Sequence, residues 1–154
     1  MASNSFILPK AEVAIRDALR AVAFDWVPAG QIQAGLTGGP LDLDADDAPD
    51  STDLPNITCI AESAGIDLPN IGTFRVSCTV QVAHAADSTN YPVCMEQSGQ
   101  VCDVLFDPSF PASLAGSGFT AFGIWHTNQS KSQSGRKWLT THAFDLVCAG
   151  SSIS

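Results

Sequence analysis

The residues best suited to chemistry form an aspartate-rich tract between positions 42 and 53. Counted from Asp42, carboxylates recur at the third, fifth, ninth and twelfth positions, as in a calcium-binding loop. However, Asp47 stands where such a loop needs glycine, and the twelfth carboxylate is a short aspartate rather than a bidentate glutamate. The pattern therefore favours a solvated acidic loop, or an acidic surface that contacts a partner, over a metal site. Its candidate contact residues are Asp42, Asp44, Asp46 and Asp47.

The cysteines and histidines lack the spacing of known metal or catalytic motifs. None of the five cysteines forms a C-x-x-C pair, and none of the three histidines stands in an H-x-H or H-E-x-x-H arrangement. The chain also has no nucleophile elbow, phosphate-binding loop or dinucleotide-binding glycine motif. We therefore expect five free thiols in a reducing compartment, no catalytic residues, no metal and no cofactor.

The charge of the chain is strongly unbalanced. Its 154 residues carry 16 acidic and 7 basic side chains, a net charge of −9, with no Lys or Arg between Arg20 and Arg75. Such a chain is poorly suited to neutralising phosphates, so we expect no specific binding of nucleic acid. No apolar run approaches the roughly 20 residues of a membrane span, and the N-terminus lacks the pattern of a secretory signal. Length and composition predict one domain, 1–154.

The elements that would position any site follow from hydrophobic periodicity. An apolar stripe predicts a helix over residues 9–26, and a second helix is expected over 91–106. Alternating apolar and polar residues predict strands at 73–84 and 137–148. A short β-prone run predicts a strand at 57–62, and 119–126 is expected to be a strand with apolar residues on both sides. The remaining segments are a long acidic loop (30–56), a turn (65–72), a loop (107–118), a polar flexible hairpin tip (127–136) and a flexible tail (149–154).

These elements predict the α+β class: a small, mostly antiparallel sheet of about four strands with two helices packed on one face. The run from Phe119 to Trp125 is apolar on both sides, because Phe119, Phe122, Ile124 and Trp125 cannot all face one core from a regular strand. We therefore expect contacts with another copy or a partner through Phe119, Phe122 and Trp125. Lys131 and Arg136 in the hairpin tip, which is free of acidic residues, are further candidates for such contacts.

The element order resembles that of the tail terminator proteins, and related neck proteins, of long-tailed bacteriophages. The matching features are the helix Pro9–Trp26, the strand Gly72–His84, the helix Tyr91–Phe106 and the closing hairpin. In that hairpin the segment Gly118–Ile124 leads through Gly135–Trp138 to the terminal strand Leu139–Cys148. The resemblance covers nearly the whole chain and rests on pattern and order rather than on a residue motif.

The resemblance implies a structural role in the virion. Six copies would form a ring on the head-proximal end of the tail tube, stop tube polymerisation, and bind the head-completion or stopper connector. DNA would pass through the lumen without specific binding, and assembly would take place in the host cytoplasm. The alternatives are another head–tail connector (a stopper or tail-completion protein), a capsid-associated adaptor, or a small enzyme with an unrecognised site. Mutant virions with long or headless tails would favour the terminator role.

Overall fold

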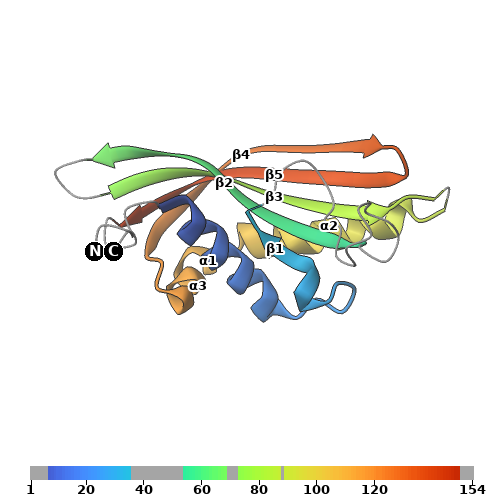
Figure 1. Ribbon diagram of the computed structural model, residues 1–154, viewed down its shortest axis with the longest axis horizontal. Coiled ribbons are helices and arrows are strands. Elements are labelled where there is room, and N and C mark those ends of the chain that lie inside the picture. The colour runs from blue at the N-terminus through green and yellow to red at the C-terminus, as the bar shows by residue number, and fades with distance from the viewer. Residues whose placement is uncertain (1–6, 36–53, 69–72, 88, 150–154) are drawn as a thin grey trace.

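The computed structural model describes residues 7–35, 54–68, 73–87 and 89–149 (Figure 1). The helices α1 (Ile7–Val22), α2 (Tyr91–Phe106) and α3 (Phe110–Ser113) all lie on the same side of one long sheet (Figure 1). No described helix covers the other side of that sheet. The architecture is therefore a two-layer α+β fold, which confirms the predicted class.

The sheet has five strands in the order β1-β2-β3-β5-β4. They are β1 (Ile32–Ala34), β2 (Asn56–Leu68), β3 (Thr73–Ala85), β4 (Ala121–Ser134) and β5 (Lys137–Ala149). β1 runs parallel to β2, whereas the other neighbouring strands are antiparallel. The mostly antiparallel sheet is thus confirmed, with one strand more than expected. That strand follows the short 3₁₀ turn Ala29–Gln31. β1 and the last two residues of the turn lie within the segment 30–56, for which the sequence predicts an irregular loop.

Two strands are longer than the pattern of apolar and polar residues predicts. β2 continues through residues 62–68, so the expected strand 57–62 and part of the expected turn 65–72 form one strand. β4 continues to Ser134, so the prediction of a flexible hairpin tip over 127–136 is wrong. The turn itself is only Gly135 and Arg136, between the paired residues Ser134 and Lys137. Gly135 has φ +61°, and glycine at the first position is typical of the type II′ turn that suits strand twist.

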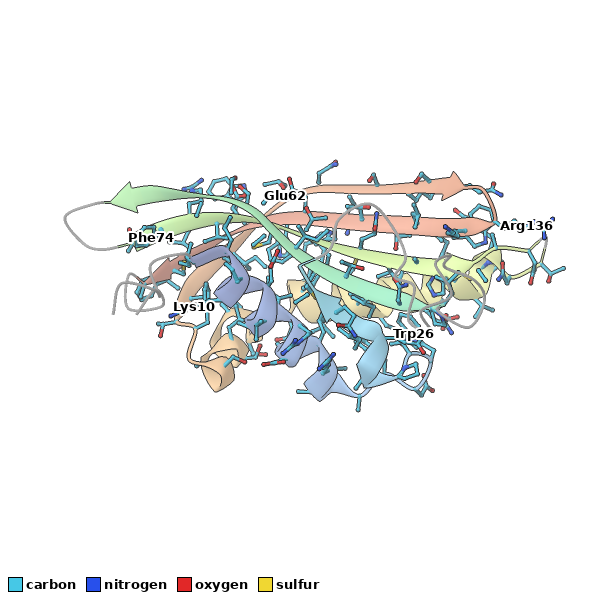
Figure 2. The ribbon with its side chains drawn as sticks, in the orientation of Figure 1. Lys10, Trp26, Glu62, Phe74 and Arg136 are labelled. Carbon is cyan, nitrogen blue, oxygen red and sulfur yellow. The ribbon has the colours of Figure 1, made fainter. Side chains whose placement is uncertain are left out.

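α1 begins earlier and ends earlier than predicted. It buries an apolar face against the sheet and stops at Val22, where Ala23 adopts a left-handed φ of +59°. Trp26, which was expected to lie on the last helical turn, instead leaves the helix. Its ring stacks on His84 of β3 with centroids 5.3 Å apart, and its Nε1 donates to Gln100 of α2 at 2.9 Å. Figure 2 shows Trp26 on the helical side of the sheet.

α2 occupies the predicted residues 91–106, with Pro92 in its first turn. The following segment, 107–118, is not a plain loop as expected, because it contains α3 and the 3₁₀ turn Leu114–Ser117. Phe110, Leu114 and Phe119 of this region are all buried. Three large apolar side chains in ten residues stabilise these short helices by burial, roughly 1.5–3 kcal/mol for each side chain.

The core lies between the helices and one face of the sheet. Alternate residues of β5, namely His142, Phe144, Leu146 and Cys148, point into it and are buried, as the sequence predicted. β3 contributes Val76, Cys78, Val80 and Val82 from the neighbouring positions. The period of two along both strands therefore leaves mostly polar and small residues on the opposite sheet face, with Leu139 and Val147 of β5 as the larger apolar ones.

Candidate assembly surface

β4 forms one edge of the sheet, because it pairs with β5 and with no other strand of the described chain. The pairing is interrupted by register shifts at Phe122 and at Thr127 and is regular from Asn128 to Ser134. The side chains from Thr127 to Gln133 are all exposed. A strand this polar gains little from burial within its own subunit, so its accessible edge and faces make it a candidate contact surface.

Phe122 and Trp125 are the exposed aromatic side chains of β4, and we call these two residues the aromatic patch. Their side chains are 63% and 66% exposed, the largest values among the big apolar residues of the described chain. Trp125 is paired with Asp145, whereas its neighbours Ile124 and His126 are paired with the core residues Leu146 and Phe144. Trp125 therefore lies on the sheet face away from the helices, and Phe122 stands at the register shift between Ala121 and Gly123. This confirms that the apolar run 119–125 cannot be buried completely within one subunit.

Phe119 is the exception among the aromatic candidates. It precedes β4, and only 1% of its surface is exposed because it packs in the core. Its backbone N–H donates to the carbonyl of Leu114 at 3.2 Å, which fixes the chain as it enters the sheet. The prediction that Phe119 contacts a partner is therefore wrong, and the surface candidates on this strand are Phe122 and Trp125.

The basic candidates occupy the far half of the β4–β5 hairpin. Lys131 is exposed, donates a hydrogen bond to the hydroxyl of Tyr91, and has its Nζ 4.8 Å from the centre of that ring. Arg136 is exposed at the turn, at the end of the hairpin (Figure 2). Its carbonyl accepts from the N–H of Ala86 at 2.8 Å, which ties the turn to the end of β3. Asp42, Asp44, Asp46 and Asp47 lie outside the described residues, as does the possible calcium loop.

Two histidines that the sequence did not connect form a hydrogen-bonded pair. His126 Nδ1 lies 2.8 Å from His142 Nε2, and the ring of Phe106 stacks on His126 with centroids 3.9 Å apart. The buried Nδ1 of His142 has no hydrogen-bond partner. An orphaned N–H costs more than an orphaned lone pair, so we assign the proton of His142 to Nε2, from which it donates to His126. Through its contacts with Phe106, the pair packs the C-terminal end of α2 against β4 and β5.

A groove of about 560 Å³ lies between α2 and the sheet, beside the histidine pair. Its lining includes one thiol, Cys102, and one imidazole, His142, which could form a nucleophile–base pair. Burial, together with the neighbouring His126, lowers the pKa of His142 to about 4, and burial raises the pKa of the Cys102 thiol. Both groups are therefore neutral at pH 7, which is the opposite of an activated thiolate–imidazolium pair.

The other cysteines are also in the thiol form. Burial raises the pKa of Cys78 and Cys59 well above the ordinary range and that of Cys148 to about 11. All five cysteines are free, and Cys102 is the only one that is not buried. Within the part of the chain that the structure describes, no group of three or more metal-binding side chains comes together. None of the described helices has both the length and the apolar character needed to cross a membrane.

Comparison with known proteins gives a likeness of fold. No family model matches the chain, and no curated protein is similar to it in sequence. Among solved structures, the fold is similar to that of a chain from the "Virion of native gene transfer agent (GTA) particle". The match has a TM-score of 0.52 and 9% sequence identity, and covers 90% of this chain and 94% of the other. The fold described above is therefore one that also occurs in a chain of a virion particle.

Proposed function

We propose that the protein is a structural component of a phage-like virion, in the neck between head and tail. It forms a ring, expected to contain six copies, that caps the tail tube, ends tube polymerisation and binds the head connector. The observation that carries the proposal is the aromatic patch, Phe122 and Trp125, at the edge of a fold that also occurs in a virion particle. Exposed aromatic side chains on an open strand edge are typical of a surface that contacts a partner.

The charge of the chain suits a passage for DNA. The chain has 16 acidic and only 7 basic side chains. Carboxylates repel phosphates, so a lumen lined by some of these acidic side chains would let DNA slide. We further propose that the acidic tract Asp42–Asp47 faces either this lumen or the basic end of a neighbouring hairpin, where Lys131 and Arg136 lie. Surface ion pairs of this kind contribute only about 0–1 kcal/mol each, so they would fix register rather than supply strength.

A scaffolding role accounts for the groove better than catalysis does. The histidine pair is used to hold Phe106 and the end of α2, and the thiol of Cys102 accepts a hydrogen bond from Gln129 Nε2 at 3.5 Å. Desolvation shifts the pKa values of His142 and Cys102 toward their neutral forms, which leaves no thiolate in the groove at pH 7. We therefore propose that the protein is not an enzyme and needs no cofactor.

Electron microscopy of particles produced without this protein tests the proposed role. We expect tails of abnormal length, or tails without heads, and recovery of normal particles when the chain is supplied from a plasmid. Tails of normal length beside filled heads would instead assign the chain to another connector, such as a stopper. Normal particles would contradict a role in the neck altogether.

A further inference from the structure

The backbone of β4 offers hydrogen-bonding groups along its open edge. Residues that flank a two-residue hairpin turn form a hydrogen-bonded pair, here Ser134 and Lys137, and the next pairs alternate. The N–H and C=O groups of Gln133, Lys131 and Gln129 are therefore directed away from β5, toward the edge. Bulges and prolines commonly protect edge strands, but between Asn128 and Ser134 the strand has neither.

The opposite edge of the same sheet has a shorter open stretch on β2. β1 covers β2 only as far as Cys59, and beyond it the N–H of Ala61 donates to Glu12 Oε2, on the side away from β3. Ala64 pairs with Val76, two residues along β3 from the partner of Ala61, and so has the same orientation. The backbone groups of Ala64 and Ile66 therefore face this edge, where no described strand pairs with them.

We propose that β4 of one copy pairs with the open edge of β2 in the next copy, so that the sheet continues from subunit to subunit around the ring. This rests on the proposed ring function and names the contact that builds it. Two different edges on one chain give a head-to-tail contact, and such contacts close into rings when the rotation between copies allows it. The strand order makes β4 antiparallel to β2, so a repeated copy meets its neighbour through an antiparallel pairing.

The charge on β4 argues against a symmetric contact between two copies of this strand. Lys131 lies in the middle of the regular part of β4, between Asn128 and Ser134. Pairing of β4 with β4 of a second copy, centred on the regular stretch, would place the two Lys131 side chains opposite each other. Like charges directly opposite on neighbouring strands are destabilising, so the symmetric contact is disfavoured.

Proline substitutions at single edge residues test the pairing. Gln129→Pro removes an N–H directed at the open edge of β4, and Ala64→Pro does the same on β2, while both leave the internal ladder intact. Gln129→Ala is the matched control, because it loses the same side chain and keeps the N–H. We expect at least a tenfold loss of assembled protein by mass for each proline variant and none for the alanine variant.

Mixing the two proline variants distinguishes head-to-tail from symmetric pairing. Each variant keeps one intact edge, so the mixture should stop at dimers that contain one copy of each. If Ala64→Pro alone forms dimers and Gln129→Pro does not, the contact joins two copies of β4 and the proposal is wrong. Rings of Gln129→Pro as abundant as those of the wild type would also overturn it, while leaving the neck role intact. A wild-type chain that is monomeric in solution and on particles would overturn both.

Hydrogen exchange keeps the test informative if a proline variant fails to fold. In the assembled wild-type protein, the amides of Gln129, Lys131, Gln133, Ala64 and Ile66 should exchange at least tenfold more slowly than in the monomer. The amide of Ala61, which is already bonded to Glu12, should change least. Equal exchange at the five edge amides in both states would contradict the pairing.

Discussion

The carboxylate of Glu12 accepts a hydrogen bond from the backbone N–H of Ala61, with Oε2 and the nitrogen 2.9 Å apart. This contact joins α1 to β2 just beyond the point where β1 ends. Gly35, which follows β1 with φ +88°, also lies close to Glu12: a Cβ at this position would lie 3.3 Å from Oε1. One side chain thus satisfies an edge N–H that β1 does not reach, and it packs beside the chain where β1 stops.

Glu12→Ala should lower the free energy of unfolding by about 1–3 kcal/mol, because it leaves the N–H of the buried Ala61 without its partner. Glu12→Gln keeps an acceptor oxygen and should cost less. Urea denaturation measures both, with Glu96→Ala on the exposed side of α2 as the control, expected within about 0.5 kcal/mol of wild type. An alanine variant as stable as this control would show that the contact is not stabilising.

Because of the histidine pair, the free energy of unfolding should depend on pH. The pKa of His142 is about 4 in the folded chain and 6.5 in its ordinary state. Between these values the unfolded chain binds a proton that the folded chain does not, so the free energy of unfolding falls as the pH is lowered from 6.5 to 4. Above pH 6.5 His142 is neutral in both the folded and the unfolded chain, so its titration costs no stability there. From pH 6.5 to 4 we expect the free energy of unfolding to fall by about 2 kcal/mol because of this group.

The variant His142→Gln isolates this effect from the titration of carboxylates. Its side chain can still donate to His126, but it does not titrate, so its stability should change less between pH 6.5 and 4 than that of the wild type. The charged groups on the surrounding elements, Asp103 of α2 and Lys131 of β4, are the same in both proteins. Parallel stability curves for the two proteins would contradict the assignment of the effect to His142.

The thiols should react in two classes. Cys102 is partly exposed and should react first with a thiol reagent in the native protein, whereas the four buried cysteines should react only as the chain opens. Under denaturing, non-reducing conditions the count should be five. Cys102→Ser should remove the fast phase alone. A denatured count of three or one would mean that disulfides form in the protein.

The aromatic patch should matter for assembly and little for folding. Phe122→Ser with Trp125→Ser removes side chains that are more than half exposed, so the free energy of unfolding of the single subunit should change by less than about 1 kcal/mol while assembly is lost. Val93→Ser on α2, with 54% exposure, is the matched control and should assemble normally. Phe119→Ala should instead cost about 3–5 kcal/mol of stability. A doubly substituted chain that still assembles would remove the patch from the interface.

The parts of the fold with clear periodicity could be predicted from the sequence. The alternation in β3 and β5 and the apolar positions of α2 gave those elements nearly the right bounds. The far half of β4 could not be found in this way, because Thr127–Ser134 is polar at every position. It is a strand because of its backbone pairing with β5 and the turn at Gly135, which side-chain patterns do not reveal.

The candidate site was predictable only where it depends on a single strand. The apolar residues on both sides of the run around Trp125 predict the exposed patch. That prediction, however, depends on a regular strand that begins at Phe119. The register shift at Phe122 and the later start of β4 place Phe119 in the core instead. The pairing of His126 with His142 depends on the register of the β4–β5 hairpin, including the shift at Thr127, and no local spacing encodes it.

Image averaging of the neck in intact particles that contain this protein tests the central claim most directly. We predict a closed ring of this fold at the head-proximal end of the tail tube, with the edge of β4 and the patch of Phe122 and Trp125 against a neighbouring copy. Density for the chain on the capsid shell, or a neck built without it, would contradict the account.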